Sequence, residues 1–355
     1  MVAKDGAGQP ALSAAAQGGS FNHFKRWRAT LNNSENTSPN PVKRSLVLGG
    51  RGFIGTHLID ALLDQGHFVR CFDRPNVVPL GESHFNHPNF ELCEGDFTSE
   101  AEVAKALEGC DVCYHLVSTT LPKSSNADPV FDVESNVVAT IRLLNLAVKS
   151  GLRKIIFISS GGTVYGDPTQ VPIPETHATD PACSYGIAKL AIEKYLALFH
   201  RLYGLDYTVL RLANPFGEGQ RTYASQGAVA VFLGKVLRGE TVEIWGDGTV
   251  VRDYIHVSDV VRALLASSAQ SGEEHVFNIG SGRGHSLNEV LDAIERVAGR
   301  NASRQYLSGR GFDVPVSVLD IERAKQSLGW APVVSFDHGL ERFAAWLSDN
   351  PESTH

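Results

Sequence analysis

Short apolar runs alternate with amphipathic stretches along residues 45–214. Each run is rich in β-branched or aromatic residues and ends at Gly, Asp, Asn or Ser, which is typical of a buried strand. The runs are SLVLGG (45–50), HFVRCFD (67–73), NFELCEGD (89–96), DVCYHLVS (111–118), KIIFISS (154–160) and DYTVLRLAN (206–214). The pattern predicts a strand at each of these places.

Between these runs, apolar residues recur at helical spacing. The stretches concerned are 53–66, 98–109, 134–151 and 184–204. Gly66 is a typical C-terminal stop for the first helix, and Ser99 with Glu102 predicts a capping box at the second. Strand–helix alternation at this spacing predicts an α/β fold with a doubly wound, Rossmann-type parallel sheet.

The regular alternation ends after Asn214, where short strands, helices and Gly-rich turns mix. This change predicts a smaller, mixed α/β substrate-binding lobe over residues 214–350. Residues 44–213 would form the cofactor-binding domain, with segments such as 251–270 returning to it. Ligands of such folds bind at the carboxyl edge of the sheet, which the lobe would cover.

Residues 1–43 differ from the rest of the chain because Gly, Ala, Ser, Asn and Gln dominate them. Such a composition cannot bury a core, so we expect a disordered or loosely held extension. One stretch within it, FNHFKRWRATL, spaces apolar residues helically among basic ones. That spacing leaves open a short helix that touches a partner or a membrane surface. The apolar core of a signal peptide is missing, so export is not expected.

Composition and charge exclude some classes of function for this protein. With 43% hydrophobic and 20% charged residues, the chain resembles ordinary globular proteins. Its formal charge of −7 argues against a nucleic-acid-binding surface, and no apolar run is long enough to cross a bilayer. Five scattered cysteines suit a reducing, cytoplasmic compartment. Cys110 and Cys113 fall in a strand-like run, so buried thiols are expected there and no metal site.

The first strand leads into a glycine-rich turn that predicts a dinucleotide site. The turn carries a G-x-G-x-x-G pattern from Gly50 to Gly55, which Gly49 extends. Glycines at this spacing permit a tight turn and let a pyrophosphate approach the N-terminus of the next helix. The second strand ends in Asp73, whose carboxylate can accept both ribose hydroxyls. Asp73 would repel a 2′-phosphate and favours NAD over NADP, a preference that the neighbouring Arg74 moderates.

A second motif, YGIAK, points to proton-transfer chemistry. Tyr185 and Lys189 are four residues apart, which places them on one helix face. A nearby ammonium, together with an oxidised nicotinamide, stabilises a phenolate and lowers the pKa of Tyr185 from its usual value of about 10. Tyr185 is therefore expected to take or give a proton near neutral pH while a hydride moves to the ring.

These motifs together resemble the extended short-chain dehydrogenase/reductases, and within them the nucleotide-sugar epimerase/dehydratase branch. The resemblance runs from Ser45 to Trp346 and includes EGDF, SSGGTVYG, RLANPFGEG, WGDGTVVRDYIHVSD and GRGFDVP. The chain is most similar to UDP-hexose 4-epimerases. The resemblance implies that Tyr185 takes the proton of the sugar 4-hydroxyl while hydride passes from C4 to NAD. The 4-keto sugar would then turn over and receive the hydride on its other face.

The resemblance also implies which residues hold the ligands. Expected around NAD are Gly49, Gly52, Phe53, Ile54, Gly55, Asp73, Arg74, Asp96, Phe97, Leu116, Val117, Ser118, Tyr185 and Lys189. Expected around a UDP-sugar are Thr120, Asn214, Trp245, Arg252, Arg310, Asp313 and Ser317. The two arginines would hold the diphosphate. Ser317 is small where relatives limited to unacetylated hexoses tend to carry Tyr, which leaves room for UDP-GlcNAc and UDP-GalNAc.

The segment ISSGGTVYG departs from the family pattern. The resemblance places a Ser or Thr hydroxyl four residues before Tyr165, but Gly161 occupies that position. If the backbone stays extended, Thr163 lies on the same side as Gly161. Thr163 is therefore the expected source of the hydroxyl and Ser160 the second candidate, with the hydroxyls of residues 118–120 as further ones.

Three other functions stay open at this point. A 4-ketosugar reductase on this scaffold often prefers NADP, which Asp73 disfavours without excluding. A 4,6-dehydratase needs a carboxylate pair before the Tyr of VYG, and GGTV has none. A non-catalytic NAD or sugar-nucleotide sensor is supported only by Gly161. The resemblance further implies a homodimer through helices around 132–150 and 184–203, and a role in supplying surface-polysaccharide precursors.

Overall fold

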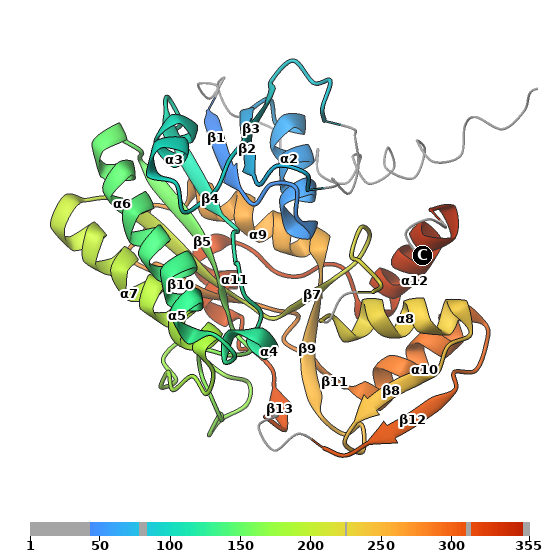
Figure 1. The fold of residues 1–355 in the computed structure, drawn as a ribbon. Coiled ribbons are helices and arrows are strands. Elements are labelled where there is room, and N and C mark those ends of the chain that lie inside the picture. The colour runs from blue at the N-terminus through green and yellow to red at the C-terminus, as the bar shows by residue number, and fades with distance from the viewer. Residues whose placement is uncertain (1–42, 78–83, 224–225, 310–313, 351–355) are drawn as a thin grey trace, which may run out of the picture. The chain divides into compact units, whose positions relative to one another are not determined.

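A sheet of seven parallel strands is the centre of the computed structural model, within the part that it describes: residues 43–77, 84–223, 226–309 and 314–350. Their order is β10-β6-β5-β4-β1-β2-β3 (Figure 1). The strands are β1 (Arg44–Leu48), β2 (Phe68–Asp73), β3 (Phe90–Glu94), β4 (Val112–His115), β5 (Lys154–Ser160), β6 (Asp206–Leu212) and β10 (Val276–Ile279). The predicted doubly wound sheet is confirmed. Its seventh strand, β10, comes from the region where the sequence loses its regular alternation.

The carboxyl ends of β1 and β4 mark the point where the chain reverses its direction across the sheet. From β1 the chain adds β2 and β3 on one side and then returns to place β4 on the other side. The loops after β1 and β4 therefore diverge at this edge. Open α/β sheets bind their ligands at such a reversal.

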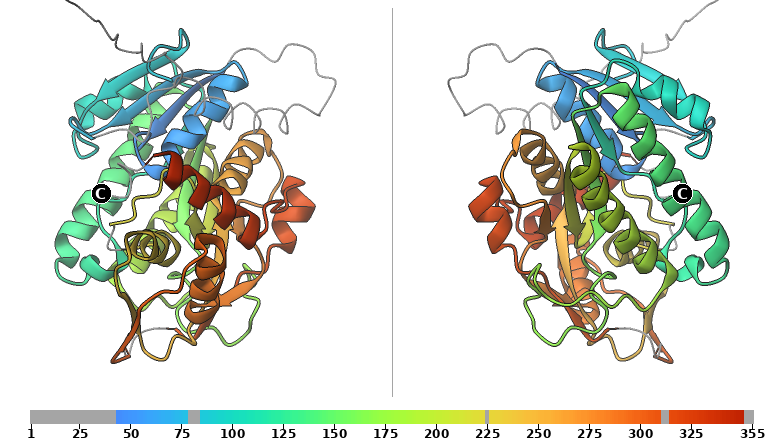
Figure 2. Two further views of the ribbon diagram at one scale, coloured as in Figure 1. Left: turned by 90° about the vertical axis from the view of Figure 1, so that its right-hand side faces the viewer. Right: turned by 90° about the vertical axis from the view of Figure 1, so that its left-hand side faces the viewer.

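Helices cover both faces of the sheet, as Figure 2 shows from either side. One layer contains α3 (Glu100–Leu107), α6 (Ala139–Ser150) and α7 (Ser184–Tyr203), and the other contains α2 (Phe53–Asp64), α9 (Val257–Ala269) and α11 (Glu322–Leu328). Alternate strand residues pack against each layer: Leu46 and Phe157 against the first, Val47 and Ile156 against the second. This arrangement is expected of strands that are buried on both faces.

After β6 the chain builds a smaller lobe. Here β7 (Asn214–Phe216), β11 (Gly284–Ser286) and β13 (Val316–Ser317) pair with β9 (Val251–His256), and β8 (Val242–Trp245) pairs with β12 (Arg304–Leu307). These strands share an apolar core with α8 (Ala228–Arg238), α10 (Leu287–Ala298) and α12 (Phe336–Asp349). One residue separates β6 from β7, so the main sheet leads directly into the lobe. In contrast, α9 follows β9 and packs against α2 of the main sheet.

The region between β4 and α6 differs from the single helix predicted over 134–151. Two short helices, α4 (Pro122–Ser125) and α5 (Pro129–Asp132), come first. The chain then runs through a π-helical turn, η1 (Val133–Val138), into α6. Such π-helical turns are uncommon and concentrate at functional sites.

The capping box predicted at Ser99 and Glu102 is wrong. Ser99 is the N-cap residue of α3, but its side chain makes no capping hydrogen bond. The Glu102 carboxylate instead accepts a hydrogen bond from the backbone N–H of Asp96 at 2.6 Å. A capping box does begin α10, between Ser286 and Glu289.

The expectations for the N-terminal extension concern residues that, apart from Lys43, lie outside the described part of the chain. Among the described helices, none is both long and apolar enough to cross a membrane.

Candidate active site

A tight glycine turn joins β1 to α2 at the carboxyl edge of the sheet. Gly49 has a left-handed backbone with φ +80°, and its N–H donates to the carbonyl of Phe72 at 2.8 Å. A Cβ on Gly55 would lie 2.4 Å from the carbonyl oxygen of Gly49, so the first turn of α2 rests on the loop backbone. Phe53 and Ile54, both half-buried, begin this helix. The N–H groups of its first turn have no helical acceptor, as anion-binding helix ends require.

Asp73 lies at the end of β2 beside this turn. Its Oδ2 accepts a hydrogen bond from the backbone N–H of Arg51 at 2.9 Å, and its Oδ1 accepts one from Arg74 at 2.8 Å. Each carboxylate oxygen keeps a lone pair with which it can accept a ribose hydroxyl. Arg51, which sequence reasoning did not single out, is buried and donates to Glu94 at 2.8 Å. Its charge is therefore held within the protein beside Asp73.

The loop after β4 borders the glycine turn. A Cβ on Gly49 would lie 3.3 Å from backbone atoms of both Leu116 and Val117, so these two predicted cofactor positions contact the turn. Phe97 is buried. Asp96 is exposed, and its carboxylate accepts two hydrogen bonds from within its own turn, which lower its pKa.

Tyr185 and Lys189 occupy consecutive turns of α7, as their spacing predicts. The Nζ of Lys189 lies 5.6 Å from the centre of the Tyr185 ring and 4.7 Å from that of Phe157. It donates to the carbonyl of Ile158 at 2.9 Å. This hydrogen bond ties α7 to the end of β5, at the same edge of the parallel sheet as the glycine turn.

The pKa of Tyr185 is raised in the protein by itself. Burial raises it to about 12, the negative charges of Cys183 and Asp132 add to the rise, and a hydrogen bond with Ser118 opposes it. Burial also lowers the pKa of Lys189 to about 8, against the effect of nearby carboxylates. The expected lowering of the Tyr185 pKa includes the charge of an oxidised nicotinamide, so it stays a prediction for the NAD-bound protein. Burial is the largest cause of the rise, and a positive charge beside the phenol would lower the pKa.

The segment ISSGGTVYG turns at its glycines and does not stay extended. The N–H groups of Thr163 and Val164 both donate to the carbonyl of Ser160, at 3.4 and 3.2 Å. The argument that assumed an extended strand is therefore wrong here. A Cβ on Gly161 would lie 2.6 Å from a methyl carbon of Leu319. Position 161 thus faces packed side chains, which explains its glycine.

The hydroxyl of Thr163 lies inside the protein. Its Oγ1 is buried and makes no hydrogen bond to any residue that the structure describes. The turn that carries it packs against the start of α7, since a Cβ on Gly186 would lie 2.8 Å from the Thr163 carbonyl oxygen, and Gly186 follows Tyr185. A buried hydroxyl without a partner is costly, and the ligand contact of Thr163 stays a prediction. Ser160 is half-buried at the end of β5.

The hydroxyl of Thr120 is hydrogen-bonded to a buried carboxylate, that of Asp132. The Oγ1 of Thr120 donates to Oδ1 of Asp132, so a hydroxyl predicted to face the sugar is held inside the protein. The Oγ of Ser118 donates to the carbonyl of Thr120 at 3.2 Å. The sequence does not indicate that Asp132 is buried, because FDVESNVV is compatible with a helix whichever way its polar residues face.

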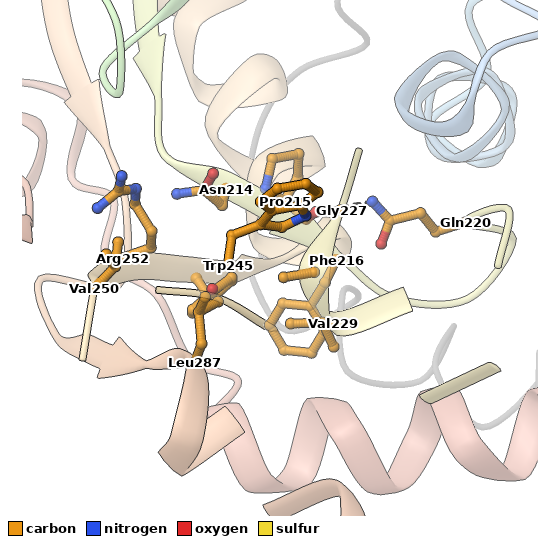
Figure 3. Close-up of a pocket in the computed structure, with 12 residues that line it drawn as sticks. Asn214, Pro215, Phe216, Gln220, Gly227, Val229, Trp245, Val250, Arg252 and Leu287 are labelled. Atoms are coloured by element: carbon orange, nitrogen blue, oxygen red, sulfur yellow. Dashed lines mark hydrogen bonds between the residues drawn. The ribbon is translucent and has the colours of Figure 1, made fainter. Parts of the chain in front are cut away.

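Asn214, Trp245 and Arg252 line one pocket in the smaller lobe (Figure 3). Asn214 donates to the carbonyl of Asp253 at 2.9 Å, and Arg252 donates to two backbone carbonyls at 2.6 and 2.9 Å. Apolar side chains complete the wall, among them Pro215, Phe216, Val229, Val250 and Leu287. An apolar wall with a guanidinium, an indole and two amides, those of Asn214 and Gln220, suits a polar ligand that carries a flat ring.

The other three residues predicted to contact the sugar nucleotide in the smaller lobe do not line this pocket in the described structure. Ser317 is buried and pairs with Arg252 across β13 and β9, so it lies beside a pocket residue. Arg310 and Asp313, predicted to contact the phosphate and the ribose or base, lie outside the described residues.

The loop after β7 is held by a network that sequence reasoning missed. Oε2 of Glu218 lies 3.0 Å from Nε2 of His256, and Oε1 accepts from Arg342 at 2.9 Å. Burial alone would raise the pKa of Glu218, but these partners lower it to about 2. His57 of α2 bonds to the Glu218 carbonyl at 2.7 Å. The network joins the helix of the glycine turn to the loop that borders the pocket.

The family follows from a comparison with known proteins. The model of the NAD dependent epimerase/dehydratase family matches residues 45–280, from β1 to the end of β10. The chain belongs to this family. The resemblance seen in the motifs is thereby confirmed, and the protein is an NAD-dependent enzyme.

Individual members of the family are similar over nearly their whole length. The UDP-glucose 4-epimerase of Mycolicibacterium smegmatis is 36% identical over 84% of this chain and 96% of that protein. A dTDP-4-dehydro-6-deoxyglucose reductase of Escherichia coli is 34% identical over 84% and 95%. The structure of Thermotoga maritima UDP-glucose 4-epimerase with UDP-glucose matches with a TM-score of 0.82 at 38% identity, over 87% of this chain and 99% of that one. An epimerase and a reductase are thus similar to this chain at nearly the same sequence identity.

The residues of this family member fit NAD. Gly49, Gly52 and Gly55 form a turn that excludes side chains: a Cβ on Gly52 would also lie close to the Gly49 carbonyl oxygen, at 3.2 Å. A turn without side chains at a helix N-terminus admits a pyrophosphate. Asp73 would bind the adenosine ribose, and Leu116 and Val117 would border the cofactor from the β4 side.

Replacing Asp73 with Ala is expected to raise the dissociation constant of NAD about tenfold, because two ribose hydroxyls lose their acceptor. Asp73→Asn keeps one acceptor oxygen, so its dissociation constant for NAD is expected to lie between those of Asp73→Ala and the wild type. Calorimetric titration of the cofactor-free protein with NAD measures both. Unchanged affinity in Asp73→Ala would contradict the assignment.

Proposed function

We propose that this protein interconverts UDP-hexoses that differ at C4 and keeps NAD bound throughout. The observation that carries the proposal is the Tyr185–Lys189 pair, which lies against the end of β5 at the edge where the glycine turn begins α2. A phenol and an ammonium at the cofactor edge of such a fold support reversible oxidation of an alcohol.

Each residue has a separate task in this reaction. Tyr185 takes the proton of the sugar 4-hydroxyl and later returns it. Lys189 favours the phenolate by its charge. Thr163, whose hydroxyl has no partner among the described residues, donates to the sugar 4-oxygen. NAD, held by the glycine turn and Asp73, would supply a reversible hydride acceptor for C4 and a positive charge near the phenol. That charge matters because burial by itself holds the pKa of Tyr185 at about 12.

The pocket of the smaller lobe supports a nucleoside diphosphate as the anchor of the substrate. Arg252 offers charge and planar donors to a phosphate, and Asn214 offers an amide. Trp245 is 41% exposed and presents a ring on which a base can stack. We propose UDP as this anchor, as in the similar epimerases. Ser317, small and next to Arg252, suits acetylated as well as unacetylated hexoses.

Proton NMR of the purified protein with UDP-Glc, UDP-Gal, UDP-GlcNAc and UDP-GalNAc, without added reductant, tests this function. Interconversion within either pair, together with NAD that stays bound through purification, would support it. Binding of these nucleotides without any interconversion would refute it.

Reduction of a 4-keto nucleotide sugar is the second candidate, because a reductase is among the similar relatives. The same Tyr185 would then protonate the 4-oxygen, but each turnover would consume one reduced cofactor. Loss of absorbance at the NADH band with a 4-keto sugar nucleotide would favour this alternative. Dehydration across C5 and C6 lacks support, because the turn Gly161–Val164 holds no carboxylate.

Thr163→Val is expected to lower kcat about tenfold with little change in KM, because valine keeps the shape and removes one hydrogen bond to the reacting oxygen. Ser160→Ala, the runner-up position, is expected to keep nearly full activity. Initial rates of both variants in the NMR assay decide between the two hydroxyls. Full turnover by Thr163→Val would show that the hydroxyl comes from elsewhere.

We also propose a homodimer through the exposed face of α7. Ile187, Leu198 and Leu202 follow one another at helical spacing and are 54%, 42% and 58% exposed. Val130 of the adjoining α5 is 67% exposed and extends this surface. Contiguous apolar surface of this kind is typical of an association site.

Leu198→Glu is therefore expected to shift the protein from dimer to monomer in sedimentation velocity. Val333→Glu, at an apolar position 71% exposed outside this surface, is the matched control and should leave the dimer intact. A wild type that sediments as a monomer would contradict the proposal.

A further inference from the structure

An ion pair joins the glycine turn to the end of β3. Nη1 of Arg51 donates to Oε1 of Glu94 at 2.8 Å. Arg51 stands between Gly50 and Gly52 of the turn, and Glu94 is the last residue of β3, the strand at the edge of the sheet. The Arg51 side chain is buried, whereas that of Glu94 is half-exposed. A guanidinium in the predicted cofactor turn is thus held by a carboxylate from the edge strand.

The contacts of Arg51 place this ion pair beside Asp73, the residue expected to bind the adenosine ribose. The backbone N–H of Arg51 donates to Oδ2 of Asp73 at 2.9 Å, and Nη1 of Arg51 donates to the carbonyl oxygen of Arg74, the next residue, at 3.5 Å. Asp73 and Glu94 are paired in register across β2 and β3, so their side chains leave the sheet on the same side. The ion pair therefore lies at the ribose end of the predicted cofactor site.

Arg51 has the chemistry of a phosphate-binding residue. Its guanidinium carries five N–H donors in a planar fork, which can bind a phosphate through two parallel hydrogen bonds. One of these donors, Nε, is buried and makes no hydrogen bond to any residue in the described part of the chain. Another, on Nη1, is bound to Glu94. The phosphate that would lie beside Asp73 is the 2′-phosphate, by which NADP differs from NAD.

Arg74 lies at the same edge and also carries a guanidinium. It is exposed, and its backbone N–H donates to Oδ1 of Asp73 at 2.8 Å. Its charge acts on Asp96, whose pKa is lowered first by hydrogen bonds from Thr98 and to a smaller extent by Arg74. A 2′-phosphate bound by Arg74 would not require Arg51, so variants at position 51 separate the two arginines.

We propose that Glu94 is a specificity-determining residue for the cofactor: by its pairing with Arg51 it keeps that guanidinium from binding a 2′-phosphate. Asp73 then accepts a free 2′-hydroxyl, while the charge of Arg51 is balanced within the protein. Two carboxylates thus select NAD over NADP, since Asp73 repels the 2′-phosphate and Glu94 occupies the arginine that would bind it. The inference concerns cofactor binding alone and does not depend on which sugar the enzyme converts.

Calorimetric titration of the cofactor-free protein with NAD and with NADP measures this selectivity. The wild type is expected to bind NADP about 100-fold more weakly than NAD, because the 2′-phosphate meets the charge of Asp73 and the hydrogen bond of the 2′-hydroxyl is lost. Glu94→Ala is expected to tighten the binding of NADP about tenfold, because the released guanidinium forms a charge-assisted pair with the phosphate. The affinity of this variant for NAD should stay close to that of the wild type.

A double variant assigns the gain in NADP affinity to Arg51. In Arg51→Met/Glu94→Ala the gain is expected to disappear, since methionine keeps an unbranched stem without the charge. Glu91→Ala is the matched control: it removes another exposed carboxylate of β3, which pairs with Arg70 at 2.9 Å, and should change neither affinity. A Glu94→Ala protein that binds NADP no better than the wild type would overturn the proposal. So would a gain that survives the loss of Arg51, because another cation such as Arg74 would then bind the phosphate.

Glu94→Gln replaces Glu94→Ala if the alanine variant is too unstable to titrate. Glutamine keeps an oxygen that accepts from Arg51 but carries no charge, so a smaller gain in NADP affinity is expected. A melting curve without cofactor shows whether each variant is folded. A folded Glu94→Gln protein with the wild-type affinity for NADP would contradict the proposal. Because the measured quantity is the affinity for each cofactor, the result holds even if the protein proves not to be an epimerase.

Discussion

Tyr185→Phe is expected to lower kcat for the interconversion of UDP-hexose epimers about 10³-fold. The ring stays beside Lys189, but the group that takes and returns the proton is lost, and general acid–base catalysis contributes on this order. Because the lost interaction exists only at the reacting oxygen, kcat and kcat/KM should fall by the same factor. Rates from NMR at saturating substrate and a titration with UDP-sugar measure the two quantities.

Tyr195→Phe is the matched control for this variant. Tyr195 lies on the same helix but is 36% exposed, so loss of its hydroxyl should leave the rate unchanged. Retention of more than about a tenth of the wild-type rate by Tyr185→Phe, well outside the range for a lost acid–base group, would remove Tyr185 from its proposed role.

Gly55→Ala is expected to weaken NAD binding about 100-fold and to lower the melting temperature. The added methyl carbon would lie 2.4 Å from the Gly49 carbonyl oxygen and 2.7 Å from the Gly50 Cα. Both contacts are with backbone atoms, so relief requires the turn and the first turn of α2 to move apart. Such overpacking costs about 1–3 kcal/mol of stability, and the displaced turn no longer matches the pyrophosphate. Calorimetric titration with NAD and thermal denaturation measure the two effects.

Gly272→Ala is the control for the general cost of a methyl group at glycine. Its Cβ would meet only the tip of the flexible Gln270 side chain, at 3.2 Å. Near wild-type NAD affinity is expected for this variant. If Gly55→Ala bound NAD as well as this control does, the glycine turn would not be the pyrophosphate site.

Several features could be predicted because neighbouring residues encode them. β5 lies at the predicted residues Lys154–Ser160, since a strand buried on both faces appears as an unbroken apolar run. The glycine turn and the start of α2 depend on a few consecutive residues. The pairing of Tyr185 with Lys189 could be predicted for the same reason, because a spacing of four residues sets their relation within one helix.

Features that depend on distant parts of the chain could not be predicted. β10 joins the sheet only because β6 offers it a free edge, where Val276 pairs with Val209. The turn at Gly161 depends on Leu319, which occupies the space that a side chain there would fill. The place of Asp132 depends on donors from the loop after β4 and from the start of α7. None of these partners is near in sequence.

The sequence by itself determined six strands of the sheet, the cofactor turn and the phenol–lysine pair, because local periodicity and local spacing specify them. Only the tertiary structure decided that the Thr163 hydroxyl is buried without a partner among the described residues, that Thr120 donates a hydrogen bond to Asp132, and that burial raises the pKa of Tyr185. The physical reason is that hydrogen-bond satisfaction and desolvation depend on every atom around a group. For these residues the surrounding atoms come from segments far apart along the chain.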